Sequence, residues 1–243
     1  MSRLLLIVGA LLCIVVGVQA CTPVPTTVSP MTPPGIQEAE EAEGEGGVNG
    51  GNEGEASAGG NLVLSDSFAP PHTGWVRFET ADSAVYAQAG EMFLEDRGTG
   101  SSVYTPLVSE SRQDVTVSAH LRYVQGTVDN WMGLICRQRD EQNYYLFGIS
   151  ADGYYLVLRM AAGVPTPLVG PHASDVINVG KAENDMRVRC RDNKLSLWVN
   201  DTLLVSRVDE ELMGSGAVAL FTDAIEPGRT TTVAFDDVTI TAP

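Results

Sequence analysis

Apolar and polar residues alternate along most of the chain after residue 60. In the segment 114–124 every second residue is apolar. The apolar residues are Val115, Val117, Ala119, Leu121 and Tyr123, and the polar residues between them are Thr116, Ser118, His120 and Arg122. A period of two is typical of a β-strand with one buried face. The segment is therefore predicted to be a strand whose odd positions lie in the core.

The stretch 131–160 carries the strongest sheet signal, because Asp152-Gly153 is typical of a two-residue type I′ hairpin turn. With this pair as the loop, one face is buried. That face holds Tyr145, Phe147, Ile149, Ala151, Tyr154, Leu156, Leu158 and Met160. The outer face holds Tyr144, Leu146, Gly148, Ser150, Tyr155, Val157 and Arg159. A slip of one residue would lose this arrangement.

A second hairpin is predicted around Asp192-Asn193. Its register buries three pairs, which are Met186 with Val199, Val188 with Leu197 and Cys190 with Leu195. On the outer face the same register sets Arg187 opposite Trp198 and Arg189 opposite Ser196. Asn200-Asp201 then turns the chain into a further strand at 203–205.

Further short strands are predicted at 62–64, 91–95, 102–108, 216–222 and 231–240. No segment keeps helical periodicity for three turns. About a dozen strands over roughly 180 residues indicate an all-β fold, a two-sheet antiparallel sandwich. The terminal strands, near residues 62 and 240, are expected to lie side by side.

The N-terminus has the features of an export signal. Residues 4–18 form an apolar run behind Arg3, which is shorter than the roughly 20 residues of a membrane span. The run ends in Val18-Gln19-Ala20-Cys21, which resembles the lipobox of bacterial lipoproteins. The resemblance implies a signal peptide at 1–20, a palmitate-type lipid on Cys21 and anchoring at the extracytoplasmic face of the cell membrane. The alternative is ordinary secretion after Ala20, with Cys21 as a free thiol.

Residues 21–60 are predicted to be a disordered tether. The first part is rich in Pro and Thr and the second in Gly and Glu, so neither can bury enough apolar surface to fold. The globular domain is accordingly predicted to span 61–243.

The chain has a net charge of −16. An acidic protein is a poor partner for nucleic acid, so a nucleic-acid partner is excluded. The domain holds two cysteines, Cys136 and Cys190, both on predicted core faces. A lone pair in an exported protein favours a disulfide, and two buried thiols that never meet are the alternative.

The order of several short motifs resembles the concanavalin A-like (LamG-type) jelly-roll domains of bacterial surface proteins. It also resembles the related domain named for 3-keto-disaccharide hydrolases. The motifs are Ser65-Asp66-Ser67-Phe68, Gly74-Trp75, GLICR at 133–137, NYYLF at 143–147, Asp152-Gly153-Tyr154, Val188-Arg189-Cys190, LWVN at 197–200 and FDDV at 235–238. The resemblance implies a jelly-roll sandwich. Many members of this superfamily bind glycans and some hydrolyse them.

Catalysis is not favoured. The laminarinase-type hydrolases of this fold carry an E-x-D-x-x-E strand, and this chain has none. Retaining glycosidases also need two carboxyl groups about 5 Å apart. A hydrolase acting on 3-keto-disaccharides is therefore the least favoured of the functions considered.

A binding face is indicated by Arg and aromatic residues at outward strand positions. Aromatic rings stack on sugar rings, and Arg donates to hydroxyls or carboxylates. The candidate residues are His120, Arg122, Trp131, Arg137, Arg139, Tyr144, Tyr155, Arg159, Arg187, Arg189 and Trp198. The alternative is that these Arg pair with acids on neighbouring strands and that Trp198 stacks on Arg187.

Asp66, Asp236 and Asp237 would meet if the terminal strands pair, and such oxygen ligands suit a structural calcium ion. Solvated carboxylates at an edge-strand bulge are the alternative. No other cofactor is expected. The favoured function is a non-catalytic binding module whose partner is a glycan, possibly an acidic one. The alternative is a structural or protein-interaction module of the cell envelope, and the oligomeric state stays open.

Overall fold

The computed structural model describes residues 60–71, 74–98 and 101–243. The predicted signal peptide, Cys21 and the tether up to residue 59 lie outside the described residues. Within the described part of the chain no helix has the length and apolar character needed to cross a membrane.

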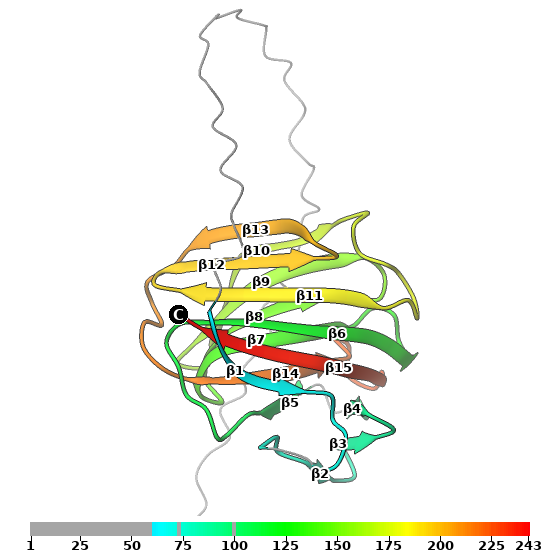
Figure 1. Cartoon of the computed structure of the whole chain (residues 1–243). Helices are drawn as coiled ribbons and strands as arrows, with labels where there is room; N and C mark the ends of the chain where they lie inside the picture. The colour runs from blue at the N-terminus through cyan, green and yellow to red at the C-terminus, as the bar shows by residue number, and fades with distance from the viewer. Residues whose placement is uncertain (1–59, 72–73, 99–100) are drawn as a thin grey trace, which may run out of the picture. The chain divides into compact units, whose positions relative to one another are not determined.

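Two antiparallel sheets form the fold (Figure 1). The large sheet runs β13-β12-β11-β6-β15-β4-β3-β2, with β1 also paired to β15, and the small sheet runs β10-β9-β8-β7-β14-β5. The strands are β1 (Asn61–Asp66), β2 (Phe78–Glu79), β3 (Ser83–Gln88), β4 (Glu91–Asp96), β5 (Val103–Pro106), β6 (Val115–Gly126), β7 (Trp131–Asp140), β8 (Asn143–Ile149), β9 (Tyr154–Ala161), β10 (Val164–Ala173), β11 (Asn184–Arg191), β12 (Lys194–Val199), β13 (Thr202–Val208), β14 (Ala217–Asp223) and β15 (Thr231–Ala242). The predicted all-β jelly-roll sandwich is confirmed.

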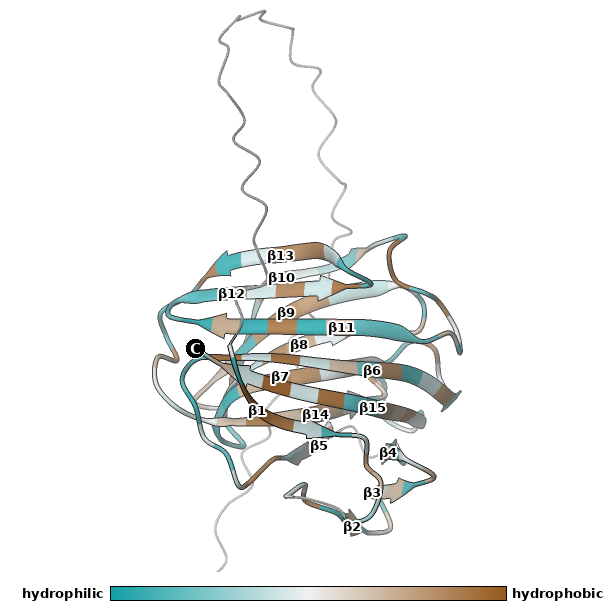
Figure 2. Ribbon diagram, in the orientation of Figure 1, coloured by the Kyte–Doolittle hydropathy of each residue, from teal (hydrophilic) through white to brown (hydrophobic). Residues whose placement is uncertain are grey.

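Three predicted features of the large sheet are confirmed. β6 alternates between buried odd and more exposed even positions, and Figure 2 shows the corresponding bands of apolar residues. β11 pairs with β12 in the predicted register, from Met186↔Val199 to Arg191↔Lys194. The terminal strands β1 and β15 pair, with Asn61 opposite Ala242.

The strands β2, β3 and β10 were not predicted. β10 contains Pro165, Pro167 and Pro171, which cannot donate to a sheet ladder. The structure places β10 at the edge of the small sheet, where a missing donor costs little.

The predicted register of β8 and β9 is wrong by one residue. The loop is Ala151-Asp152-Gly153, closed by a hydrogen bond from Ser150 N to Tyr154 O (2.9 Å), and Gly153 has φ +96°. This is a three-residue hairpin loop with a left-handed glycine at its end, a form that also favours Asp-Gly. As a result every residue of β9 faces the opposite way from the prediction. Val157 is in the core, and the residues turned to the outer face are Leu156, Leu158 and Met160.

The core fills the space between the sheets. Phe147 and Val188 are fully buried, as their predicted parity requires. Cys136 of β7 and Cys190 of β11 form a disulfide that joins the small sheet to the large one. The predicted disulfide is therefore confirmed.

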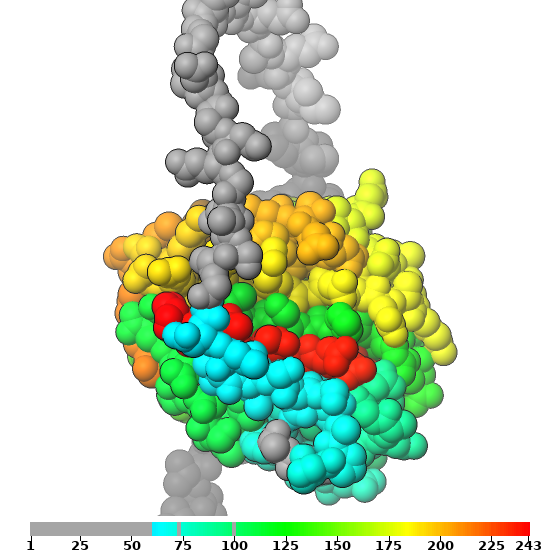
Figure 3. All heavy atoms as spheres, in the orientation of Figure 1, coloured from blue at the N-terminus to red at the C-terminus, as the bar shows by residue number. Residues whose placement is uncertain are grey.

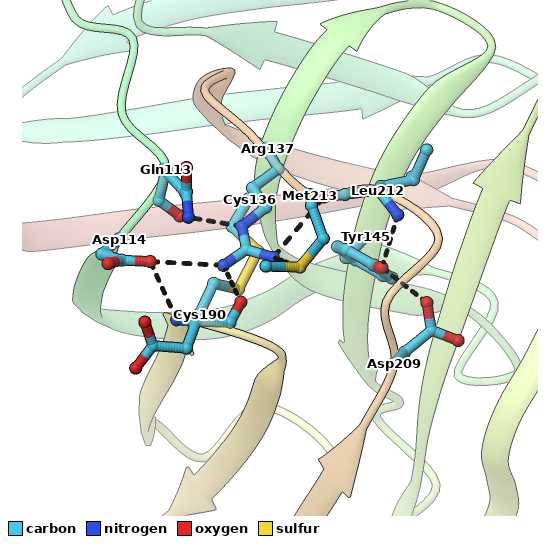
Figure 4. Close-up of a disulfide and its surroundings, with 10 residues drawn as sticks. Gln113, Asp114, Cys136, Arg137, Tyr145, Cys190, Asp209, Leu212 and Met213 are labelled. Carbon is cyan, nitrogen blue, oxygen red and sulfur yellow. Dashed lines mark hydrogen bonds and ion pairs between the residues drawn. A yellow bond between two sulfur atoms is a disulfide. The ribbon is translucent and has the colours of Figure 1, made fainter.

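Arg137 was predicted to point outward, and this is wrong. The β7–β8 register shifts between Cys136 and Asp140, and within this bulge Arg137 has φ +52° and a fully buried side chain. Figure 4 shows its guanidinium beside the disulfide. It donates to the carbonyls of Gln113 (2.8 Å), Asp192 (2.5 Å) and Leu212 (3.5 Å) and lies 3.3 Å from Asp114 Oδ1.

Candidate functional site

The eleven residues predicted for a binding face fall on several parts of the domain, although three of them, His120, Arg187 and Trp198, line one hollow of about 350 Å³ on the large sheet. Those on the outer face of the large sheet are His120, Arg122, Arg187, Arg189 and Trp198. Trp131 and Tyr144 lie on the outer face of the small sheet, and Arg139 is exposed near the end of β7. Arg137 is buried, and Tyr155 and Arg159 are on the inner side of β9.

Two of the cationic side chains on the outer face of the large sheet, Arg122 and His120, lie against acidic residues. Arg122 donates from Nε (2.9 Å) and Nη2 (2.8 Å) to the two carboxylate oxygens of Glu91 on β4. His120 Nε2 lies 3.0 Å from Asp185 and its Nδ1 lies 3.6 Å from Asp237. Figure 3 shows this face, with β15 in red between β1 and β6. These contacts match the alternative interpretation, in which the cations pair with acids on neighbouring strands.

Trp198 points to the outer face but is only 7% exposed. The guanidinium carbons of Arg187 and Arg189 lie 4.7 Å and 5.1 Å from the centre of its ring. Two cations therefore cover the face that a sugar would need, and the contacts are cation–π interactions within the protein.

Arg159 and Tyr155 face inward because of the β9 register. Arg159 Nη1 donates to Asp209 Oδ2 (2.7 Å), and Tyr145 donates its hydroxyl to Asp209 Oδ1 (2.6 Å). Burial, followed by the hydrogen bond to Asp209, raises the pKa of Tyr145 to about 12. Tyr155 packs edge-on against His172 of β10, with ring centres 5.9 Å apart. Arg159 and Tyr145 thus tie the small sheet to the 209–212 loop, whereas Tyr155 packs against β10.

A second apolar cluster covers the outer face of the small sheet, and the sequence did not predict it. We call it the outer apolar face. Its members are Tyr104, Trp131, Ile135, Tyr144, Leu146, Leu156, Leu158, Met160, Ala219 and Phe221. The strand register aligns them in rows, such as Leu158, Leu146, Ile135 and Ala219 across β9, β8, β7 and β14. Ile135, Tyr144, Leu146, Ala219 and Phe221 are at most 8% exposed, and the other five members are partly exposed. The accessible apolar surface of this face is therefore made by Tyr104, Trp131, Leu156, Leu158 and Met160, which are the candidates for contact with a ligand.

Aromatic rings lie over the middle of this face. A Cβ added at Gly148 would be 3.3 Å from Trp131 Cε3 and 3.3 Å from Phe221 Cζ. The absence of a side chain at Gly148 is what lets these two rings approach the strand. Phe221 is buried, whereas Trp131 is partly exposed and available to a ligand.

One hollow of about 430 Å³ adjoins Trp131, and we call it the Trp131 hollow. It is lined by Asp129, Trp131, Ser150, Asp152, Tyr154, Pro171 and Ile225. Tyr154 is 42% exposed. The Ser150 hydroxyl donates a hydrogen bond to the Asp152 carboxylate and accepts one from Tyr154 N (2.9 Å). The hollow therefore combines two aromatic side chains with carboxylate and hydroxyl acceptors.

A second hollow of about 430 Å³ lies near the other end of β7, and we call it the Tyr104 hollow. It is lined by Tyr104, Pro106, Val108, Glu110, Ser111, Gln138, Arg139, Asp140, Glu141 and Ala217. Burial, then the Glu141 carboxylate, raises the pKa of Tyr104 to about 12. Gln138 is 7% exposed, and its Oε1 accepts no hydrogen bond within the described residues. A buried acceptor of this kind is one that a ligand hydroxyl could satisfy.

Sequence reasoning missed Asp129, Tyr104, Gln138 and Tyr154. Tyr154 was assigned to the core because the turn was taken to have two loop residues. Asp129 and Gln138 carry no distinguishing pattern, since they join the hollows only through strand pairing and the β7 bulge.

The predicted calcium ligands are not brought together. Asp66 accepts hydrogen bonds from Phe68 N (2.8 Å) and Trp75 Nε1 (3.1 Å). Asp236 Oδ1 accepts from Asp237 N (2.7 Å). Across the ranges that the structure describes, no three His, Cys, Asp or Glu side chains are grouped so as to hold a metal ion.

No protein-family model matches this chain, and no curated protein matches it. Solved structures do resemble it. The carbohydrate binding module CBM66 from Bacillus subtilis has a TM-score of 0.57 and 16% sequence identity, covering 71% of this chain and 98% of that one. A beta-glucanase from Bacillus licheniformis has a TM-score of 0.54 and 12% identity, covering 76% and 99%.

The catalytic domain of an endo-1,3-beta-glucanase (laminarinase) from Thermotoga petrophila RKU-1 is also similar. Its TM-score is 0.54 and its identity 8%, with 75% of this chain and 97% of that domain covered. At these identities the likeness establishes the fold, a jelly-roll sandwich, and leaves the activity to the site itself.

Proposed function

We propose that this protein is a non-catalytic glycan-binding module that holds its ligand against the outer apolar face of the small sheet. The observation that carries the proposal is the pair of hollows at the two ends of β7, with exposed aromatic side chains and hydrogen-bond acceptors. Gln138 lies seven positions after Trp131 on β7, which is roughly 23 Å of strand. A span of this length has room for several sugar rings, which would stack on the partly exposed side chains.

The jelly-roll fold supports the proposal, because similar structures include a carbohydrate binding module and glucanases. The proposal moves the glycan from the predicted Arg-rich face to the small sheet, since the large-sheet cations already have partners. Of the predicted residues, Trp131, Arg139 and Tyr144 stay in the site.

Binding without catalysis fits the acids of the Trp131 hollow. Asp129 and Asp152 are both exposed. Glycosidases instead keep one carboxyl protonated by burying it in an apolar setting, where it acts as the general acid.

The test is isothermal titration of residues 60–243 against a panel of neutral, acidic and amine-bearing oligosaccharides. Trp131→Ala and Tyr154→Ala are expected to weaken binding roughly tenfold each, because a stacked ring contributes about 1 kcal/mol beyond its area. Trp198→Ala is the matched control, since its ring is covered by Arg187 and Arg189. Thermal unfolding of each variant checks that the fold is kept. Failure of every glycan to bind, or equal weakening by Trp198→Ala, would overturn the proposal.

We also propose that the module is displayed outside the cell membrane by lipid on Cys21, with residues 22–60 as the spacer. The lipobox-like sequence Val18-Gln19-Ala20-Cys21 supports this. Radiolabelled palmitate is expected to enter the wild-type protein and not Cys21→Ser, which should be found in the soluble fraction. Palmitate labelling of Cys21→Ser would contradict the anchor.

A protein partner is the second candidate function. The observation in its favour is the aliphatic half of the outer apolar face, where Leu158 and Met160 pair with Pro167 and Pro165 of β10. These side chains form no hydrogen bonds and suit an apolar protein surface. Leu158→Glu is expected to abolish cross-linking to an envelope protein on intact cells, whereas Trp131→Ala should leave the cross-linking in place. Unchanged cross-linking would remove this candidate.

A further inference from the structure

The two hollows beside the outer apolar face differ in how their charges are satisfied. In the Tyr104 hollow the acids have partners within the chain. Glu110 pairs with Arg112 (2.9 Å), and Asp140 accepts from Gln142 N (2.8 Å) and Asn143 Nδ2 (2.9 Å). The carboxylates of Glu110 and Asp140 therefore already have hydrogen-bond or ion-pair partners before a ligand binds.

The Trp131 hollow keeps negative charge without a counter-ion. Within the described part of the chain Asp129 makes no hydrogen bond or ion pair, and Asp152 is bonded through one oxygen to Ser150. No Lys or Arg stands among the described residues that line this hollow. The hollow thus presents two carboxylates next to the rings of Trp131 and Tyr154.

A carboxylate beside an aromatic ring favours a cation, because the ring face and the carboxylate both attract positive charge. The same arrangement repels a uronic acid or another anionic sugar. The net charge of the whole chain, −16, acts in the same direction at long range.

Resting on the proposed function, we infer that the glycan bound here carries a protonated amine on the sugar held in the Trp131 hollow. The ligand class is an amino sugar with a free amine. The ring stacks on Trp131, and its ammonium group donates to Asp129 and Asp152. This reverses the sequence-based expectation of an acidic glycan, because none of the Arg residues behind that expectation lines the Trp131 hollow. Arg122 pairs with Glu91, and Arg187 lies over the ring of Trp198, both on the large sheet.

The test titrates residues 60–243 with a glucosamine oligosaccharide and with N-acetylglucosamine and galacturonic acid oligosaccharides of the same length. The titrations are made at about pH 6, where the amine of the sugar is protonated. The glucosamine oligomer is expected to bind roughly tenfold more tightly than its N-acetylated counterpart, with the advantage decreasing as salt is added.

Asp129→Asn and Asp152→Asn are expected to remove this preference, so that each variant binds the glucosamine oligomer and the N-acetylated oligomer with similar affinity. Asp201→Asn is the matched control, since Asp201 lies in the turn before β13 on the large sheet. An oligolysine peptide of equal charge tests whether amines alone are enough for binding. It is expected to bind far more weakly than the glucosamine oligomer.

Three results would each overturn the inference while glycan binding itself stands. They are equal affinity for the glucosamine and N-acetylglucosamine oligomers, tighter binding of the galacturonic acid oligomer, and binding of oligolysine as tight as that of the glucosamine oligomer. Failure of every oligosaccharide to bind would instead overturn the proposed function, so the two failures are distinguishable.

Discussion

At the scale of single residues, burial separates side chains that the sequence treats alike. Arg122, Arg137 and Arg187 all stood at predicted outward positions. Arg122 forms a bidentate pair with Glu91, Arg137 is buried in a β-bulge, and Arg187 covers the ring of Trp198. Alternation predicts which face a residue takes while the strand is regular, and it fails at a bulge because one inserted residue reverses the parity.

Arg137 is expected to be critical for folding stability. Arg137→Ala would leave the carbonyls of Gln113, Asp192 and Leu212 without their donor and Asp114 without its cation. Breaking a buried, hydrogen-bonded ion pair costs about 3–5 kcal/mol. Urea unfolding measures the loss, and the exposed Arg229→Ala should change stability by less than about 0.5 kcal/mol. A loss below about 1 kcal/mol in Arg137→Ala would show that the site relaxes.

Tyr145 gives the stability a dependence on alkaline pH. Its pKa rises to about 12 in the folded chain from 10.0, so folding favours the neutral phenol. This stabilisation is fully present below pH 10 and is lost as the pH rises toward about 12. Tyr145→Phe should lower the free energy of unfolding by about 1–3 kcal/mol at neutral pH, through lost bonds to Asp209 and Leu212 N, and should flatten the alkaline decline. Urea unfolding across this pH range measures both effects, with the exposed Tyr154→Phe as control. An unchanged alkaline slope in Tyr145→Phe would contradict the assignment.

At the scale of elements, the pattern within a strand was easier to predict than the register between strands. β6 and the β11–β12 hairpin follow the sequence pattern residue by residue. The β8–β9 hairpin does not, because Asp-Gly suits both a two-residue loop and the last two positions of a three-residue loop. The difference turned Leu156, Leu158 and Met160 outward and created the outer apolar face. The fold could therefore be predicted from the sequence, whereas only Trp131, Arg139 and Tyr144 of the candidate site could.

Gly153 holds that register. Its φ is +96°, and an added Cβ would lie 3.2 Å from Val179 Cγ1. Gly153→Ala is expected to cost about 1–3 kcal/mol through backbone strain and this contact. Gly180→Ala, with φ +68° and nothing within 4 Å, isolates the backbone part and should cost less. Equal losses in urea unfolding would show that the contact with Val179 contributes nothing.

At the scale of the whole molecule, one covalent bond joins the two sheets. Cys136 lies on β7 of the small sheet, which carries the proposed binding face, and Cys190 lies on β11 of the large sheet. The sequence predicted this bond because Cys136 and Cys190 are the lone cysteine pair in the domain of an exported protein. It could not predict that Arg137 would pack beside it, since that contact depends on three loops meeting.

Removing the disulfide is expected to destabilise the domain without altering the binding face. The bond joins residues 54 apart in the sequence and so restricts the unfolded chain. Through this entropy loss it contributes about 4 kcal/mol to the free energy of unfolding. The double variant Cys136→Ala, Cys190→Ala should unfold in urea at a correspondingly lower midpoint, and dithiothreitol should shift the wild type to the same midpoint. The variant itself should not respond to dithiothreitol. Glycan affinity should stay unchanged at temperatures where the variant is folded, because the outer apolar face contains neither cysteine. A fall in affinity under those conditions would mean that the spacing of the sheets, as well as the surface of the small one, shapes the site.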